Sequence, residues 1–307
     1  MARAGLPVPV FVALIAGLGL LCSPPVFTQE DPGVEPPSPD EVRVLLDRVI
    51  ANQHRDDSDA KCYERRERQF TRTSPNQNED RILTDRTFRV VPTGTGTLKL
   101  LVQENGLAVN AGLYHTELLD WERVLEVAMH PDDPRAKSSL ARTERREQQR
   151  NELVNGARDA FIANWAGREM AGRRVYDILL LEPNPGFQAH NMAQDVLTHV
   201  RAKIWIDHQS GQLARGEADI IRDISVAGFL GKVYRGGHFE IEQAEVAPGV
   251  WLPTRYQYDY MGRKFFFGFE THEVTEVGDY RRLGSTADVL NVVRNELQGG
   301  KGVPATR

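Results

Sequence analysis

The sequence predicts an α+β fold in which a large, curved antiparallel sheet is accompanied by helices. Residues 199–276 alternate with a period of two and are interrupted by short turns, the pattern of strands joined by hairpins. Residues 40–54 and 113–129 instead repeat apolar side chains at helical spacing. Many aromatic residues lie in the last predicted strands of this sheet. The function therefore depends on what that part of the sheet faces.

Residues 1–28 are typical of a secretory signal peptide. Arg3 provides a positive start, the uncharged apolar run Phe11–Cys22 is too short to span a bilayer, and cleavage after Thr28 fits the small-residue rule. We therefore expect export to the periplasm. Cys22 follows the apolar run, where a lipoprotein would carry its lipid, but Leu21 precedes it instead of a small residue. Lipidation at Cys22, with an outer-membrane location, is the alternative.

Composition favours a soluble exported domain. The chain has 307 residues and a net charge of −5, which disfavours nucleic acid as a partner. Residues 29–38 are rich in proline and predict a disordered leader, 39–283 a single domain, and 284–307 a final helix and disordered tail. Only Cys62 remains after cleavage, so no internal disulfide is expected. Its cationic neighbours suit a thiolate, although no nucleophile signature accompanies it.

The first half of the domain predicts a helix followed by strands. Ser38 and Glu41 form a capping box, and the helix should continue to about His54. Strands are predicted at Tyr63–Thr71, Thr87–Val91 and Thr97–Gln103, with a loop at 73–80. Asn105-Gly106 is a hairpin turn.

A charged helical segment, 113–162, interrupts the strands. Tyr114, Leu118, Trp121, Leu125 and Met129 mark one face of its first helix, and a second helix is predicted over 135–162 with Phe161 on its apolar face. The first helix is acidic and the second begins basic, which predicts a helical hairpin of complementary charge, with a partner-binding basic face as the alternative.

Strands resume at about residue 166. Turns are predicted at Ala171-Gly172, His208–Gly211, Pro248-Gly249 and Gly262, loops at 184–194 and 228–237, and a last helix capped by Ser285. The turn at Gly262 would place Phe265, Phe267 and Phe269 on one face of the following strand.

The sequence contains no motif that is diagnostic of a catalytic site. It contains no GxSxG, HExxH, CxxC or Walker motif, and its eight histidines are scattered. We therefore expect a protein that is not an enzyme, with no cofactor and no metal site; a hydrolase is a distant alternative.

The aromatic residues are the candidate ligand-binding side chains. They concentrate in and around the last predicted strands, and they are Trp205, Trp251, Tyr256, Tyr258, Tyr260, Phe265, Phe267 and Phe269. A packed sheet core accounts for such residues as well as a concave apolar cavity does, and the sequence leaves both interpretations open.

The hairpin phrases Lys203-Ile-Trp-Ile-Asp207, His208–Leu213 and Val250-Trp-Leu-Pro253 resemble the LolA/LolB-like family of outer-membrane lipoprotein-sorting proteins. The resemblance covers about 40–280 and is carried mainly by 199–276. It implies an incomplete β-barrel covered by helices, an apolar cavity for lipid or lipoprotein acyl chains, and no cofactor.

Two functions are consistent with the sequence. The first is an exported, non-enzymatic protein that carries or senses lipid or lipoprotein acyl chains, with other envelope proteins as further partners. The second is an exported β-rich scaffold or protein-interaction domain with a filled core and no small ligand.

Overall fold

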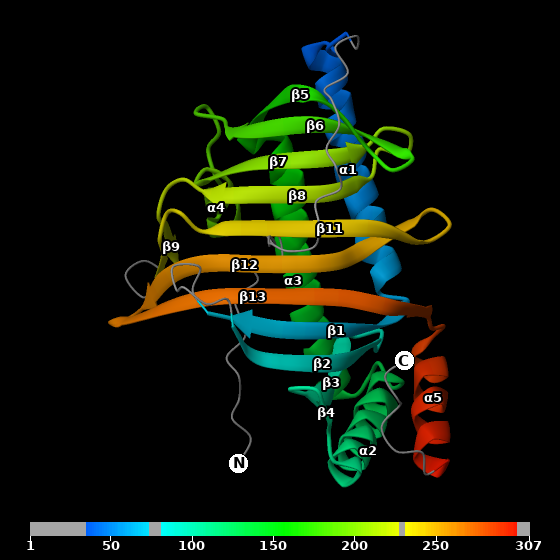
Figure 1. Ribbon diagram of the computed structural model, residues 1–307. Coiled ribbons are helices and arrows are strands. Elements are labelled where there is room, and N and C mark those ends of the chain that lie inside the picture. The colour runs from blue at the N-terminus through cyan, green and yellow to red at the C-terminus, as the bar shows by residue number, and fades with distance from the viewer. Residues whose placement is uncertain (1–34, 74–80, 227–230, 300–307) are drawn as a thin grey trace. The chain divides into compact units, whose positions relative to one another are not determined.

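The computed structural model describes residues 35–73, 81–226 and 231–299 (Figure 1). Its strands are antiparallel, and five helices accompany them in the described part of the chain. Contacts between Cα atoms divide the chain into two compact units. The first comprises the described residues up to Asp56 together with Gln148–Val274, and the second comprises Asp57–Glu147 and the residues from Thr275 onward.

The first unit is a meander of long strands. Its hydrogen-bonded order is β5 (Phe161–Ala171), β6 (Arg174–Pro183), β7 (Val200–Asp207), β8 (Leu213–Ile220), β11 (His238–Ala247), β12 (Val250–Lys264) and the first part of β13 (Phe267–Arg282). The short strands β9 (Ile224–Val226) and β10 (Gly231–Val233) form a hairpin that pairs with the end of β12. Successive hairpins of a meander turn at alternate ends, so the β5–β6, β7–β8 and β11–β12 turns share one end of this sheet.

One face of this sheet carries the core of the first unit. α1 (Pro39–Ala60) places Val42, Leu46 and Val49 there, α3 (Pro134–Ala160) contributes Leu153, and α4 (Met192–Leu197) contributes Val196. They pack against side chains of the strands, among them Leu179, Ile204, Ile206, Ile220 and Phe239. Burial of these side chains is the main source of stability in this unit.

The second unit has its own sheet and core. The strand order is β4 (Leu107–Ala108), β3 (Thr97–Glu104), β2 (Ile82–Pro92), β1 (Tyr63–Arg72) and the last part of β13. α2 (Ala111–Ala128) and α5 (Thr286–Gln298) pack on it through a buried cluster that includes Tyr114, Leu118, Trp121, Leu290 and Val293. The outermost strands, β5 and β4, each pair with one described strand only, so the sheet does not close into a barrel. The predicted open antiparallel sheet with helices is therefore confirmed.

Several local predictions are confirmed as well. The Ser38 backbone N–H donates to the Glu41 carboxylate at 2.7 Å, which completes the capping box of α1. Asn105 and Gly106 form the β3–β4 turn, with φ angles of 50° and 81°. Ser285 caps α5 through a second capping box with Asp288.

Other local predictions are wrong. Phe161 is the first residue of β5, because α3 ends at Ala160. α4 begins at Met192, within the last residues of the predicted loop at 184–194, and continues beyond it to Leu197. Gly262 lies within β12, and the turn follows at Phe265-Phe266. Met129 is 43% exposed because it lies beyond the last turn of α2.

The acidic face of α2 is also paired differently from the prediction. Arg294 of α5 contacts Glu122 at 2.7 Å and also contacts Glu126. The predicted pairing with the second helix occurs beside the turn, where Lys137 contacts Asp132 at 3.0 Å and Arg135 contacts Asp133 at 2.8 Å. α3 also bonds the turn before β3, where the Thr143 hydroxyl donates to the Thr95 carbonyl at 2.6 Å.

The predicted signal peptide 1–28, with Cys22, lies outside the described residues, as do most of the predicted leader and the loop at 74–80. Within the described chain, none of the helices has the length and apolar character needed to cross a membrane. The predicted division into leader, domain and C-terminal helix stays a prediction.

Candidate functional site

The three tyrosines of β12 lie on the face of the first unit that carries its core. Tyr256 pairs with Ile241 and Tyr258 with Phe239 across β11 and β12, and directly paired residues share a face. Phe239 belongs to the buried core, and Tyr258 and Tyr260 pack against it. All three tyrosines are half-buried, so their rings cover the core and remain partly accessible.

A chain of ring contacts connects this face with the end of the β12–β13 hairpin. Tyr260 stacks on Phe239 with ring centroids 5.7 Å apart, and Tyr258 meets Phe239 edge-on at 6.3 Å. Phe269 of β13 meets Tyr260 edge-on at 5.9 Å. Exposure rises along this chain, from 6% at Phe239 to 38% at Phe269. The rings thus form a continuous apolar surface from the core to solvent, which we call the aromatic face.

The remaining predicted phenylalanines lie beyond the aromatic face, at the turn itself. Phe265 and Phe266 are the turn residues, with 48% and 95% of their surface exposed, and Phe267 is 78% exposed. Their side chains are therefore not part of a packed core.

The two tryptophans lie elsewhere. Trp205 pairs with Arg215 on the opposite face of the sheet, where Lys203 and Arg215 hold their cations 4.4 and 4.9 Å from its ring. Trp251 is buried beneath the guanidinium of Arg174, 4.8 Å from its ring centre. The structure thus brings together Tyr258, Tyr260 and Phe269 but neither tryptophan. Whether any of the predicted residues binds a ligand stays a prediction.

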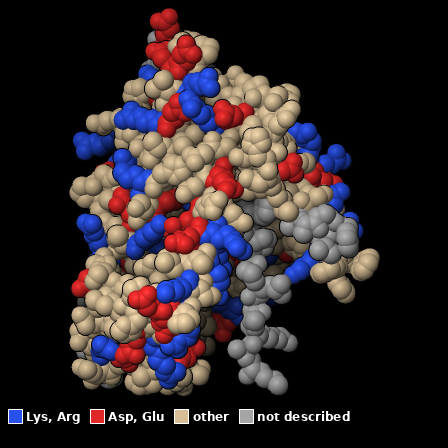
Figure 2. Space-filling view, turned by 180° about the vertical axis from the view of Figure 1, so that it is seen from behind, with Lys and Arg blue, Asp and Glu red and all other residues tan. Residues whose placement is uncertain are grey.

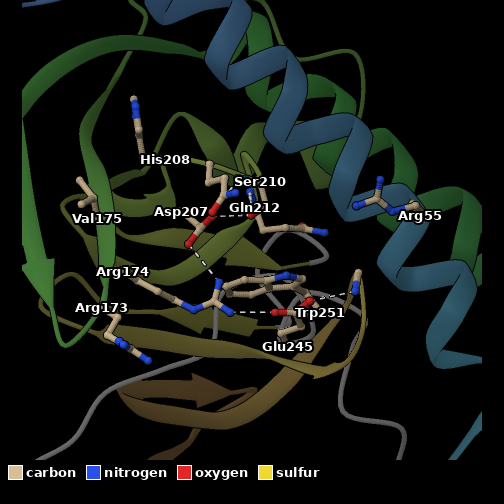
Figure 3. A pocket seen from close by; sticks show the side chains of 12 residues that line it. Arg55, Arg173, Arg174, Val175, Asp207, His208, Ser210, Gln212, Glu245 and Trp251 are labelled. Atoms are coloured by element: carbon tan, nitrogen blue, oxygen red, sulfur yellow. Dashed lines mark hydrogen bonds and ion pairs between the residues drawn. The ribbon is translucent and has the colours of Figure 1, made fainter.

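Trp251 belongs to a polar pocket of about 1010 Å³ at the end of the sheet where the β5–β6, β7–β8 and β11–β12 turns meet (Figure 3). Arg174, after the first turn, donates to Asp207 at 3.1 Å and to Glu245 at 2.7 Å. The Ser210 hydroxyl donates to Asp207 at 2.7 Å, and the Gly249 N–H donates to Glu245 at 2.9 Å. One guanidinium therefore ties three hairpins together.

The carboxylates of this pocket are engaged in holding its walls. Burial works against ionisation of Asp207, but hydrogen bonds from Ser210 and Arg174 outweigh it and lower the pKa of Asp207. α1 supports the same turn, since Asn52 donates to the Gly211 carbonyl at 2.8 Å. The described residues hold no group of three or more His, Cys, Asp and Glu side chains arranged for a metal ion. Most of the residues that line the pocket are charged or polar, so it is not the apolar cavity that was one of the two interpretations left open by the sequence.

A buried carboxyl group lies on the opposite face from the tyrosines. Glu240 of β11 pairs with Gln257 of β12 and with Glu217 of β8, and it is 2% exposed. Burial and the nearby carboxylates of Glu242 and Glu217 raise the pKa of Glu240 to about 8, although the Arg215 guanidinium contacts it. Glu240 is therefore protonated at neutral pH for much of the time.

Of the residues that line this pocket, the sequence prediction included Trp251 but missed Arg174, Asp207 and Glu245. Arg174 lies 33 residues from Asp207 and 71 from Glu245 along the chain. The predicted turns could have identified this pocket. Alternate hairpin turns of a meander lie at the same end of the sheet, and the sequence predicts all three turns that meet here.

Comparison with known proteins gives matches among solved structures only. No protein-family model and no curated protein matches the chain. A LolA superfamily protein from Nitrosomonas europaea is 9% identical with a TM-score of 0.31, covering 80% of this chain and 94% of that one. A putative outer membrane lipoprotein-sorting protein domain from Vibrio parahaemolyticus is 7% identical with a TM-score of 0.32, covering 81% and 99%.

A DUF1329 family protein from Desulfovibrio piger is 10% identical with a TM-score of 0.29, covering 78% of this chain and 92% of that one. All three TM-scores are below 0.5, so the fold described above rests on this chain's own strands and helices. The resemblance to the LolA/LolB-like family, stated from the sequence motifs, is thus accompanied by similarity to solved structures of the LolA superfamily and of a lipoprotein-sorting domain.

Proposed function

We propose that the protein is an exported, non-enzymatic binding protein that holds a lipid or lipoprotein acyl chain against the aromatic face of its first unit. The observation that carries the proposal is the unbroken series of rings from buried Phe239 through Tyr260 to half-exposed Phe269. An extended alkyl chain gains free energy by covering such a surface, at roughly 0.8 kcal/mol for each buried methylene.

The tyrosines suit this role better than they suit a filled core. A tyrosine ring has a large apolar body, so a half-buried row of such rings presents a surface that an alkyl chain can cover. Tyr256, Tyr258 and Tyr260 are all half-buried. Export, if residues 1–28 are a signal peptide, places the protein where lipoproteins are sorted.

Binding of a fluorescent fatty acid to the purified chain tests the proposal, together with native mass spectrometry of protein prepared from an envelope fraction. We expect saturable binding and a co-purifying lipid. Tyr258→Ser and Tyr260→Ser should each weaken binding about tenfold, because each removes a ring that the alkyl chain covers.

Leu180→Ser is the matched control. Leu180 is an apolar side chain of the same unit, 38% exposed, and it pairs with Lys203 on the face opposite the tyrosines. Its replacement should leave fatty-acid affinity unchanged. A chain that is lipid-free and has no affinity for the fatty acid would refute the proposal and favour the scaffold with a filled core.

A further inference from the structure

The end of the β12–β13 hairpin presents aromatic side chains to solvent without cover from the described residues. Phe266 is 95% exposed, Phe267 78% and Phe265 48%, and Met261 beside them is 50% exposed. β12 continues past its last pair with β11, His238 with Asp259, and pairs only with the short strand β10 on that side. The β12–β13 hairpin therefore extends beyond the end of β11, as Figure 1 shows.

The turn conformation makes these aromatic residues unusual. Phe265 has a φ of +54°, the left-handed region that hairpin turns normally fill with Gly or Asn. A phenylalanine there costs backbone energy, and about half of its surface still stays in water. Burial therefore offsets this cost less than it would for a residue in a packed core.

The charged residues of the turn segment are all positive. Residues 261–269 contain Arg263 and Lys264 and no acidic residue. Neither cation forms an ion pair within the described part of the chain, whereas Lys232 of β10, directly opposite Arg263, is paired with Asp223 at 2.7 Å. Elsewhere on the visible face, Lys and Arg are interspersed with Asp and Glu (Figure 2).

We propose that this hairpin end docks on a lipid bilayer that contains anionic phospholipids. Phe265, Phe266 and Phe267 enter the interface between headgroups and acyl chains, where aromatic rings partition favourably. Arg263 and Lys264 stay at the level of the lipid phosphates, with their aliphatic stems alongside the rings. The site is distinct from the aromatic face and does not depend on acyl-chain binding there.

The full chain supplies the test, with a probe that reports only the turn. An environment-sensitive fluorophore is attached at Phe266→Cys in a Cys22→Ser, Cys62→Ser background, and vesicles of phosphatidylcholine with or without phosphatidylglycerol are added. We expect a blue shift and quenching by brominated lipid with the anionic vesicles. The same fluorophore at Leu107→Cys is the matched control, because Leu107 is 75% exposed and follows another hairpin turn.

Two unlabelled variants separate the contributions, and their binding is measured by co-sedimentation with the same anionic vesicles. Phe266→Ser with Phe267→Ser should weaken vesicle binding by at least about tenfold, and Arg263→Gln with Lys264→Gln by about fivefold per cation at low salt. Both should retain the fatty-acid affinity of the unchanged protein, and far-UV circular dichroism should be unaltered because the replaced phenylalanines are exposed.

Equal responses at positions 266 and 107 would overturn the proposal, as would unchanged vesicle binding in the phenylalanine variant. A response of the same size with uncharged vesicles would overturn the role of the cations. Loss of fatty-acid affinity by tyrosine variants that still bind vesicles would concern the aromatic face alone.

Discussion

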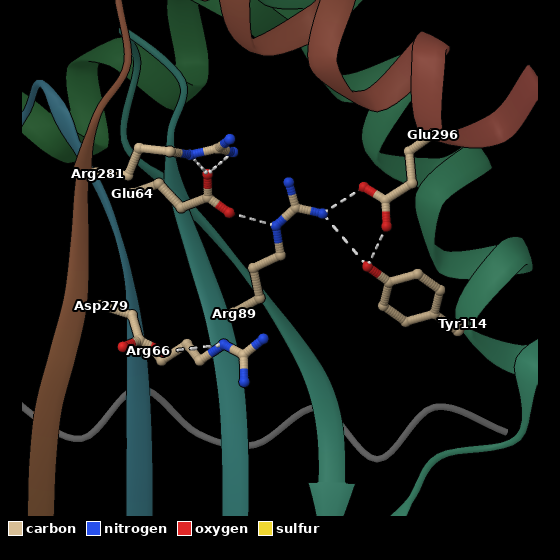
Figure 4. Close-up of polar contacts among 7 residues, drawn as sticks. All are labelled: Glu64, Arg66, Arg89, Tyr114, Asp279, Arg281 and Glu296. Carbon is tan, nitrogen blue, oxygen red and sulfur yellow. Dashed lines mark hydrogen bonds and ion pairs between the residues drawn. The ribbon is translucent and has the colours of Figure 1, made fainter. Parts of the chain in front are cut away.

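The hydroxyl of Tyr114 in α2 donates a hydrogen bond of 2.6 Å to the Glu296 carboxylate of α5 (Figure 4). The same carboxylate accepts from Arg89 of β2 at 2.6 Å, and Arg89 also donates to Glu64 at 2.5 Å. Burial and the hydrogen bond to Glu296 raise the pKa of Tyr114 to about 12. Burial works against ionisation of Glu64, but Arg89 and Arg281 outweigh it and lower the pKa of Glu64. This network fastens the last helix to the sheet of the second unit.

Glu296→Gln should destabilise the protein by about 2 kcal/mol, because the buried Arg89 loses one of its charged partners. Arg294→Gln, on the same helix, removes pairs in which 41% of the arginine side chain is exposed and should cost less than about 1 kcal/mol. Urea unfolding followed by circular dichroism measures both. Equal effects of the two substitutions would contradict a special role for the buried network.

Glu240 should make stability fall as the pH rises. Its pKa is about 8 in the folded protein against 4.5 for an ordinary glutamate, so the folded state holds the proton more tightly. The stabilisation from this proton is fully present below pH 4.5 and is lost as the pH rises to about 8. Over this range the free energy of unfolding should fall by at most roughly 1.4 kcal/mol for each pH unit.

Glu240→Gln should flatten this part of the pH–stability curve, since the amide does not titrate. Glu182→Gln is the control, because its side chain is 48% exposed in β6, another strand of the same sheet. Unfolding free energies of the three proteins at several pH values between 5 and 9 provide the measurement. A Glu240→Gln curve with the same pH dependence as the unchanged protein would contradict the assignment.

Gly262 should be intolerant of a side chain. A Cβ there would lie 2.5 Å from the Lys232 carbonyl oxygen and 2.7 Å from the Phe269 ring, whereas at Gly268 the nearest atom would be 3.9 Å away. Gly262→Ala should therefore cost about 1–3 kcal/mol and Gly268→Ala much less. Thermal unfolding compares them, and equal melting temperatures would show that β10 moves aside freely.

Ser285 should contribute about 1 kcal/mol through its capping box on α5. Ser285→Ala should lose that amount in urea unfolding, because the Ser285 hydroxyl no longer accepts from the Asp288 N–H or donates to the Asp288 carboxylate. Ser285→Asp should restore most of it, since aspartate is also a good N-cap. Failure of the aspartate variant to recover stability would indicate that the serine acts through packing.

The sequence predicted the repeating elements of this fold well and their boundaries less well. Helical spacing in α1, α2 and α5 identified the buried residues, because one apolar stripe packs on a sheet. Gly262 was mistaken for a turn because glycine marks turns and close backbone approaches alike, and only the position of Lys232 in β10 distinguishes them. The sequence could not predict that Phe266 is exposed either, because exposure depends on which neighbouring strands reach the turn.

The aromatic residues illustrate the same limit. Alternation correctly placed Tyr256, Tyr258 and Tyr260 on one face, since that follows from strand geometry. It gave no information about Trp205, whose position on the other face is set by the register between β7 and β8. The sequence prediction combined Trp205 with the tyrosines in one candidate site, but the two lie on opposite faces of the sheet.

β12 runs from the polar pocket, beside Trp251, to the exposed turn after Lys264, and it is 15 residues long. At about 3.3 Å per residue its two ends are roughly 45 Å apart along the strand. Substitutions at such a separation have additive effects on free energy when they share no partner. The two ends of a single strand can therefore be engineered independently, for example with a reporter at one end and an immobilisation handle at the other, without either disturbing what its counterpart measures.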